Sequence, residues 1–555
     1  MVGQFWRGGL IAIEIVILTA LTLATRCANY RDVFVAGSTY FTDADCYARM
    51  TRVRICAEHP GSVVRHHVFE NYPEGTTPHT TAPFDYLILA LSIPLRPFTE
   101  HALDLAGALV SPMLAVLTAW FLWWWLKRMR FRYRWAALIL YVISPMLVHG
   151  TELGRPDHQS LLLLLFTLAI CAEWGWQTER STGWDILSGI AWSLAIWISA
   201  YEPLLLLLLL LVFGLLQNRV LRRESDSAAA ARSFSFFKGR RIGLLFFVAI
   251  IALAILIERR VPTLPIFTST TAFRNWSHTI GELGSVSPLS PLWFRWAGYI
   301  ILIAPILIWL AFRKNGIRGG EMLAAEPSGG DDRPATLTPF ILVFLVGTYG
   351  LTIWQARWGY FFMLTFTIML PALLQRFKLL VTVWAAFTLS VLPILRAWDQ
   401  RLWPNEAELA QRIESRNEST QLRDLSISLK SREVLPFLAP WWLSPSIAYW
   451  SGQPGVAGSS HESLSGITDS ARFFLSEDLQ KARQIVENHK VSWVIAYDAD
   501  RTAGISALIL GKAVPEHALC YILQRAPAQA PRFLVFSAQN ATAKLFRVSP
   551  VANNP

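Results

Sequence analysis

The sequence predicts a polytopic α-helical membrane domain of about eleven to thirteen spans, followed by a soluble α/β domain. Of its 555 residues, 53% are hydrophobic and only 16% are charged, and the mean hydropathy is +0.37. This composition lies outside the range of soluble globular proteins. From about Ala397 onward the chain is polar, with no stretch long enough to cross a bilayer. We therefore expect a membrane domain over 1–396 and a separate domain over 397–555 with its own core.

Roughly eleven apolar stretches have the composition of membrane spans. The first stretch has no small-residue cleavage site after it, so we interpret it as a retained span and not as a cleaved signal peptide. Several stretches are short, as expected of tilted helices packed inside a bundle. Residues 84–97 are either a further span or a re-entrant piece. The predicted spans are 8–25, 104–126, 134–149, 158–173, 186–200, 203–217, 241–258, 292–312, 337–354, 358–374 and 378–396.

The distribution of lysine and arginine predicts how these spans are oriented. With the amino terminus inside, four basic clusters all fall on the cytoplasmic side, as the positive-inside rule requires. The net charge of +11 then reflects loop bias, and no nucleic-acid partner is expected. The polar linker 315–336 is expected to be flexible and cytoplasmic. The clusters are "KRMRFRYR" (127–134), "RVLRRE" (219–224), "KGRR" (238–241) and "RKNGIR" (313–318).

The opposite face, periplasmic or extracellular for an inner cell membrane, receives the long first loop 26–103 and the carboxyl-terminal domain. It also receives a set of acids and bases at span ends, which are costly there and usually kept for function. In the first loop, "DADCYARM" places Asp43 and Asp45 one residue apart. Two such carboxylates commonly hold a divalent cation against a phosphate. The alternative is a capped helix start, because aspartate favours the N-cap and first turn.

A second acidic pattern, "ELGRPDHQ", ends at the start of the 158–173 span. Asp157 and Gln159 lie two residues apart at a predicted helix amino terminus, where anions are favoured and backbone N–H groups are free. The alternative is that Asp157 only caps the helix after Pro156. Three roles remain open for His158, which lies between them: a ligand, a hydrogen-bond donor, or a side chain that only fills space.

Two further charged residues complete the candidate site. Glu282 lies in a loop otherwise poor in charge, and Arg357 lies at a non-cytoplasmic boundary that the positive-inside rule does not explain. Arginine is the preferred protein partner of phosphate, although an arginine extended from a span end accounts for the fragment equally well. Three acids from three external segments and one arginine describe a divalent-metal site for a phosphorylated lipid donor.

Together these motifs resemble the catalytic subunit of oligosaccharyltransferase in its archaeal and bacterial single-chain forms, a membrane glycosyltransferase of the GT-C class. "DADCYARM" is similar to that family's first acidic motif, with Asp45 as the best match to its catalytic aspartate and Asp43 as the alternative. "GRPDHQ" (154–159) is similar to the second acidic motif, and "TIGE" (279–282) matches the TIxE pattern. "ARWGYF" (356–361) resembles the arginine motif that binds the donor pyrophosphate. "YPEGTTPHTTAPFDYLI" (72–88) resembles the family's Pro-Glu-Gly stretch.

The resemblance implies a glycosyltransferase that takes a glycan from a polyprenyl phosphate or pyrophosphate, with inversion by direct displacement, at the external face. Mn²⁺ or Mg²⁺ would be its cofactor, and a protein asparagine its acceptor. The implied metal ligands are Asp45, Asp157 and Glu282. Gln159 would be either a weaker ligand or a residue that contacts the ligands and not the metal. The implied donor-phosphate residues are Arg357, Tyr201 and His158, and the implied acceptor residues are Trp441, Trp442 and Glu282.

The chain departs from the family pattern at three points. Leu443 stands where the family's Trp-Trp-Asp motif has an aspartate, and leucine cannot accept a hydrogen bond from a sequon hydroxyl. Gln159 stands where the family has Asp, Glu or His. The predicted span count also falls short of the family's thirteen, between 217 and 258.

Two other functions remain open. The first is a GT-C enzyme with a lipid, a glycan or a Ser/Thr hydroxyl as acceptor, which Leu443 motivates. The second is a transporter of a lipid-linked glycan, since charges at span ends suit it too. Against it, transporter sites lie near the midplane, and the sequence shows no internal repeat.

In the tail, 468–490 is expected to be helical, and 491–498, 532–537 and 544–548 are expected to be strands.

Overall fold

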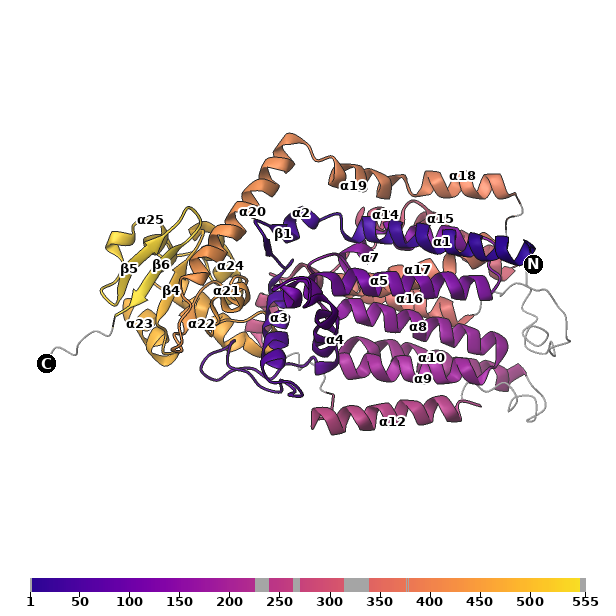
Figure 1. The fold of residues 1–555 in the computed structure, drawn as a ribbon, viewed down its shortest axis with the longest axis horizontal. Coiled ribbons are helices and arrows are strands. Elements are labelled where there is room, and N and C mark those ends of the chain that lie inside the picture. The colour runs from indigo at the N-terminus through magenta and orange to yellow at the C-terminus, as the bar shows by residue number, and fades with distance from the viewer. Residues whose placement is uncertain are drawn as a thin grey trace.

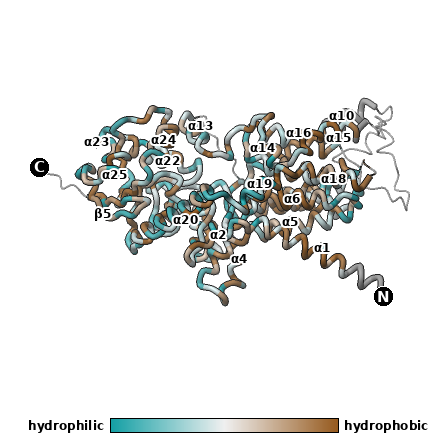
Figure 2. Tube along the Cα trace, turned by 90° about the horizontal axis from the view of Figure 1, so that it is seen from above, coloured by the Kyte–Doolittle hydropathy of each residue, from teal (hydrophilic) through white to brown (hydrophobic). Residues whose placement is uncertain are grey.

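Long helices lie side by side along the long axis of the molecule, and a small sheet with its own helices lies beyond one end of them (Figure 1). The computed structural model describes residues 2–224, 239–262, 270–313, 339–375, 377 and 379–549. The linker 315–336 lies outside these residues. The apolar residues concentrate in the helical part (Figure 2).

Each of the predicted spans corresponds to a helix or to a pair of consecutive helices. The pairs break beside a proline or glycine, for example at Ser144 before Pro145, because proline has no N–H to continue the helix. The helices are α1 (Val2–Arg26), α5 (Ala102–Arg128), α6 (Arg134–Ile143), α7 (Pro145–His149), α8 (His158–Glu179), α9 (Thr182–Ile198), α10 (Tyr201–Glu224), α12 (Arg241–Glu258), α14 (Leu292–Ala297), α15 (Ile300–Arg313), α16 (Pro339–Trp354), α17 (Gly359–Leu374), α18 (Leu380–Ser390) and α19 (Leu392–Leu402).

Within the described residues, five helices are long and apolar enough to cross a bilayer alone, and a sixth span forms if α18 and α19, bent by 47°, are counted together. The remaining apolar helices, such as α6 and α16, are shorter. The stretch 84–97 forms α4 (Ala82–Ser92) and the short helix η1 (Ile93–Leu95). At 1.5 Å per residue α4 reaches roughly 16 Å, about half the hydrocarbon thickness. It is therefore not a full span.

Burial within the bundle separates central from peripheral helices. All residues of α17 are buried, whereas the apolar stretches of α1 and α12 are mostly exposed, as expected of helices that face lipid. The helices α9 and α12 approach closely through glycines. A Cβ on Gly189 would lie 2.1 Å from the carbonyl oxygen of Gly243, so only glycine allows this contact.

The carboxyl-terminal part is a four-stranded sheet in the order β3-β4-β6-β5 with helices packed around it. The strands β3 and β4 are parallel and the other pairs are antiparallel, with Val494 opposite Phe546. The three predicted strands are found, and the predicted helix 468–490 is broken at 476–478 into two. The elements are α20 (Glu406–Ile427), β3 (Phe437–Leu438), α21 (Ser444–Ser451), η4 (His461–Ser463), α22 (Leu464–Leu475), α23 (Leu479–Asn488), β4 (Trp493–Ala496), α24 (Ala499–Leu510), α25 (Leu519–Arg525), η5 (Pro527–Gln529), β5 (Leu534–Gln539) and β6 (Lys544–Val548).

The first loop fills the junction between the two parts. It forms α2 (Tyr30–Val33), the short strands β1 (Phe34–Val35) and β2 (Ser38–Thr39), and α3 (Ala44–Glu58). Its segment around 69–72 then binds the carboxyl-terminal part through the backbone. The N–H of Gly455 donates to the carbonyl of Phe69 (3.0 Å), and the N–H of Tyr72 donates to the carbonyl of Gly455 (3.1 Å). The first loop and the carboxyl-terminal part thus form one wall.

Asn71 is the side chain that completes this attachment, and Asn71→Ala should lower the free energy of unfolding by about 1–3 kcal/mol. Its Oδ1 accepts from the N–H of Gly466 (3.0 Å) and from Oγ of Ser465 (2.8 Å), and it is buried. Alanine leaves these donors unpaired and also fits a φ of 55° less well. Thermal unfolding of the full chain in detergent measures the change.

Asn488→Ala is the matched control, because Asn488 is exposed at the end of α23. Its midpoint should stay within measurement error of the parent chain. A midpoint for Asn71→Ala equal to that of Asn488→Ala would contradict the proposed attachment.

Candidate active site

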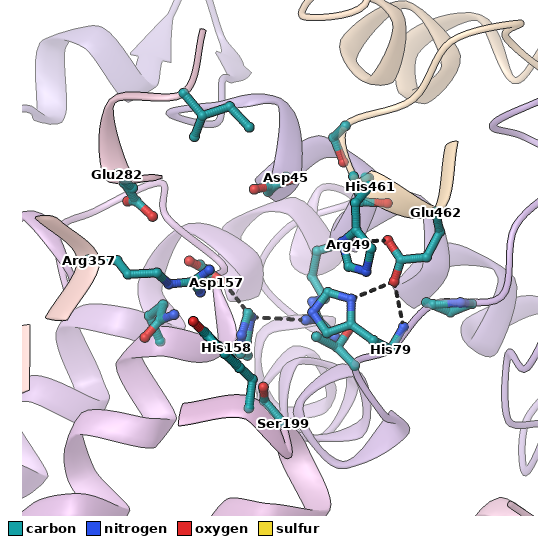
Figure 3. A pocket seen from close by; sticks show the side chains of 18 of the residues that line it. Asp45, Arg49, His79, Asp157, His158, Ser199, Glu282, Arg357, His461 and Glu462 are labelled. Carbon is teal, nitrogen blue, oxygen red and sulfur yellow. Dashed lines mark hydrogen bonds and ion pairs between the residues drawn. The ribbon is translucent and has the colours of Figure 1, made fainter. Parts of the chain in front are cut away.

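One cavity at the junction collects most of the predicted site residues. It lies between the end of the helical bundle, the first loop and the carboxyl-terminal part, and its empty space is about 1020 Å³ including the open mouth. Seven of the nine predicted residues line it, and Figure 3 shows the carboxylates and the arginine turned toward a common space. These seven are Asp45, Asp157, His158, Gln159, Tyr201, Glu282 and Arg357.

The two aspartates of the first loop have different roles. Asp43 is the N-cap of α3, and its Oδ1 accepts from the N–H of Cys46 (2.9 Å). Its other oxygen contacts Arg155. Asp45 lies in the first turn of the same helix and lines the cavity, which Asp43 does not. The structure therefore assigns the capping role to Asp43 and leaves Asp45 to face the cavity.

Asp157 occupies the N-cap position of α8 in the backbone, but its side chain makes no capping hydrogen bond. Its Oδ1 instead contacts Nδ1 of His158 at 2.6 Å. The alternative of a simple helix cap is therefore wrong for this side chain. Burial alone would raise the pKa of Asp157, but His158, Arg155 and Arg49 outweigh it and hold the pKa well below its usual range. Asp157 is a carboxylate at neutral pH.

The carboxylates that line the cavity repel one another. Enclosure by the protein and the charges of Asp43, Asp157 and Glu282 raise the pKa of Asp45 to about 8. Asp45 reaches solvent through the cavity. Repulsion by the neighbouring carboxylates therefore contributes to the raised pKa of Asp45 together with burial. Converging negative charges of this kind favour a cation.

Arg155, which the sequence reasoning missed, balances part of this negative charge. The guanidinium is buried and bridges two acids, with Nη1 at 3.1 Å from Asp43 and Nη2 at 2.9 Å from Oε1 of Glu282. The same Glu282 oxygen accepts from the hydroxyl of Tyr360 (2.9 Å). A sequence signal for Arg155 was present, because it is an arginine directly before a predicted span, at a boundary predicted to be non-cytoplasmic, as Arg357 is.

Arg357 lies in the short helix η3 (Ala356–Trp358) and pairs with a buried acid. Its Nη2 donates to Oε1 of Glu202 at 2.5 Å, and its guanidinium lies 5.8 Å from the ring centroid of Tyr201. Glu202 also accepts from Ser199 (2.9 Å) and from Nε2 of Gln159 (3.2 Å). The alternative of an arginine extended from a span end is therefore wrong, because an ion pair holds Arg357 at the cavity. The sequence reasoning did not assign Glu202 a role.

The donor set suits the predicted Mn²⁺ or Mg²⁺, since both ions prefer carboxylate and carbonyl oxygens. Oε1 of Gln159 is buried and accepts no hydrogen bond within the described part of the chain. However, Asp45, Asp157 and Glu282 are not gathered to ligand spacing. In the described ranges, only His79, His461 and Glu462 place three ligand atoms within 4.8 Å of one another. The oxygen ligands of these residues thus suit a hard cation, and the residues converge on one cavity. Their side chains must move closer together to bind the ion.

Two of the three predicted acceptor residues, Trp441 and Trp442, do not line this cavity. Trp442 and Leu443 line a second cavity of about 1560 Å³ together with Asp43. Trp441 packs against Trp276, with ring centroids 5.8 Å apart, and lines neither cavity. The structure therefore does not bring Trp441 and Trp442 to Glu282. The amino end of α3 separates the two cavities, with Asp43 on one side and Asp45 on the other.

A curated protein and several solved structures are similar to this chain. No family model matches the chain. Over 170 residues, it is 25% identical to "Dolichyl-phosphooligosaccharide-protein glycotransferase 1" of Archaeoglobus fulgidus. The match covers 30% of this chain and 27% of the relative, so it spans about a quarter of that relative's length.

Solved structures extend the likeness over most of the chain. The Archaeoglobus fulgidus oligosaccharyltransferase tethered to an acceptor peptide with the NVT sequon gives a TM-score of 0.61 at 13% identity, covering 90% of this chain and 70% of that one. The archaeal AglB of the same organism with an inhibitory peptide and a dolichol-phosphate gives 0.60 at 14%, covering 89% and 70%. ArnT from Cupriavidus metallidurans bound to undecaprenyl phosphate gives 0.52 at 12%, covering 100% and 99%.

These likenesses confirm the predicted fold class, a polytopic membrane domain of GT-C type followed by a region that contains a sheet. In its fold, the chain therefore resembles the archaeal oligosaccharyltransferases and ArnT.

Proposed function

We propose that this protein is a membrane glycosyltransferase that moves a glycan from a polyprenyl phosphate or pyrophosphate to the amide nitrogen of a protein asparagine. One observation carries the proposal. Asp45, Asp157, Glu282 and Arg357 come from four separate segments, and all line one cavity at the end of the helical bundle. Arg357, together with a cation held by the three carboxylates, would stabilise the anionic leaving group of a transfer from a phosphorylated lipid.

The donor phosphate binds, in this proposal, beside Arg357. A phosphate there replaces Glu202 as the partner of the guanidinium and gains a bidentate contact. Nε2 of His158 is buried at the cavity and has no hydrogen-bond partner among the described residues, so it is available to a phosphate oxygen. Tyr201 flanks the same position. The lipids named in the related structures, dolichol-phosphate and undecaprenyl phosphate, are polyprenyl phosphates, the chemical class of the proposed carrier.

The reaction is a direct displacement. The acceptor nitrogen attacks the anomeric carbon, and the bond from that carbon to the phosphate oxygen breaks. The phosphate leaves with the electron pair and is stabilised by Arg357, and the configuration at carbon is inverted. Asp45 and Glu282 orient the acceptor amide, and the proton that its nitrogen loses passes to one of these carboxylates. Mn²⁺ or Mg²⁺, held by Asp45, Asp157 and Glu282 with Gln159 as a weaker ligand, would supply further positive charge at the phosphate.

The proposal places the cavity and the domain 397–555 on the external side of the membrane. Lys127 and Arg128 end α5, and Ala102 begins it near the first loop. The basic cluster 127–134 therefore lies at the bundle end opposite the cavity (Figure 1). Positive charge marks the cytoplasmic end of a span. The lipid-linked donor would then reach the cavity from the outer leaflet.

A second candidate acceptor follows from Leu443. This residue lines the second cavity, and leucine there cannot accept a hydrogen bond from a sequon hydroxyl. The structure of ArnT bound to undecaprenyl phosphate also matches this chain over nearly its whole length. Robust glycosylation of an asparagine peptide from a lipid-linked donor would remove this alternative.

Asp45→Asn, Asp157→Asn and Glu282→Gln should each reduce transfer by about a hundredfold or more in membranes supplied with a lipid-linked donor. Each change keeps the shape of the side chain and removes the charge that binds a cation or orients the acceptor. The initial rate of product formation measures the effect.

The matched control is Glu58→Gln, a carboxyl at the exposed opposite end of the same helix as Asp45. It should retain the parent rate. Parent rates in all three cavity variants would contradict the proposed site.

Leu443→Asp should restore selection for a hydroxyl if the acceptor is a sequon. An aspartate can accept a hydrogen bond from Thr, and one such bond to a charged group corresponds to about a tenfold preference. The ratio of transfer to Asn-Val-Thr over Asn-Val-Ala peptides should therefore rise by about this factor. Leu443→Asn, which is also polar but uncharged, should give a smaller rise. A ratio equal in the parent and Leu443→Asp chains would contradict acceptor binding at this position.

A further inference from the structure

A cluster of two histidines and one glutamate lies on the other side of the cavity from Arg357 and Glu282 (Figure 3). His79 comes from the first loop, whereas His461 and Glu462 come from η4 of the carboxyl-terminal part. One ligand atom from each residue lies within 4.8 Å of the others. These residues belong neither to the predicted metal ligands nor to the predicted donor and acceptor residues.

The distances within the cluster are close to those of a metal site. Nδ1 of His461 lies 3.4 Å from Oε2 of Glu462, and Nδ1 of His79 lies 2.5 Å from Oε1 of the same carboxylate. Ligand bonds of about 2.0–2.1 Å in a tetrahedral site place neighbouring ligand atoms roughly 3.3 Å apart. The first pair already has this separation. The second pair needs a movement of less than about 1 Å, which a side-chain rotation supplies.

The carboxylate is fixed in place on only one side. Oε1 of Glu462 accepts from the backbone N–H of His79 at 2.9 Å. Oε2 is buried and accepts no hydrogen bond in the described part of the chain. A buried carboxylate oxygen without a hydrogen bond is costly. Hydrogen bonds leave this oxygen with only the 3.4 Å contact to Nδ1 of His461, whereas a cation between Glu462 and the two imidazoles would bind it directly.

We propose that His79, His461 and Glu462 bind a transition-metal cation of the Zn²⁺ type. Two imidazole nitrogens and one carboxylate oxygen are a ligand set that zinc accepts and Mg²⁺ does not favour. The ion joins the first loop to the carboxyl-terminal part at the cavity, with its remaining coordination position open to the cavity. This site is separate from the carboxylates Asp45, Asp157 and Glu282, and it does not depend on the proposed glycosyl transfer.

The experiment uses the full chain in detergent, stripped with a chelator and then titrated with Co²⁺ as a spectroscopic substitute for Zn²⁺. The parent chain should bind one equivalent with the intense visible absorption of a tetrahedral site. His461→Gln and Glu462→Gln should each weaken binding by at least about tenfold. Asp45→Asn should leave it unchanged, as should His517→Gln, which alters an exposed histidine of the same part.

Thermal unfolding provides the second measurement. Zn²⁺ should raise the midpoint of the parent and Asp45→Asn chains but not those of His461→Gln and Glu462→Gln, because ligand binding to the folded state adds stability. Equal metal-free midpoints show that the variants are folded. No tetrahedral absorption in the parent chain would overturn the proposal. Absorption that persists in His461→Gln and Glu462→Gln, or that disappears in Asp45→Asn, would overturn it too.

Discussion

The pairing of buried charges at one end of the helical bundle is the constraint on which the rest of the structure depends. An unpaired charge in such a position costs several kcal/mol. Arg155 therefore bridges Asp43 and Glu282, and Arg357 pairs with Glu202. Each pair joins segments far apart in the sequence, so charge pairing brings α3, the turn before α8 and the loop around Glu282 to one place. The cavity is the space that these pairs leave between them.

The same constraint explains how charged residues of the cavity could exchange their present ion-pair partners for ligands. Arg357 and Glu282 are satisfied in the described structure, but by neighbours that an anion or a cation can replace. In the proposed function, a phosphate would compete with Glu202 for Arg357, and a cation would compete with Arg155 for Glu282. The pairs keep the charged groups in place before ligands bind, which reduces the reorganisation that the reaction requires. The attachment of the first loop to the carboxyl-terminal part supplies the remaining wall, including His461 and Glu462.

The sequence predicted the elements better than their contacts. Apolar stretches located the helices, and alternation with turn residues located three strands, because both patterns are local. The span-like stretch 84–97 proved to be the short α4, since composition alone does not set helix length. Asp157, Glu282 and Arg357 lie at one cavity as predicted, but spacing alone left open whether Asp43 and Asp45 hold a cation or begin a helix. Cap geometry separated them. Arg155 and Glu202 were missed because their roles come from partners 127 and 155 residues away. Trp441 and Trp442 followed the family motif, yet they lie away from Glu282.

The central claim is that this cavity binds the phosphate of a lipid carrier. A cryo-electron microscopy structure of the full chain with a polyprenyl phosphate tests it most directly. We expect phosphate density within hydrogen-bonding distance of the Arg357 guanidinium and beside His158, with the contact between Arg357 and Glu202 lengthened or broken. Phosphate density outside the cavity, with the pair of Arg357 and Glu202 intact, would contradict it.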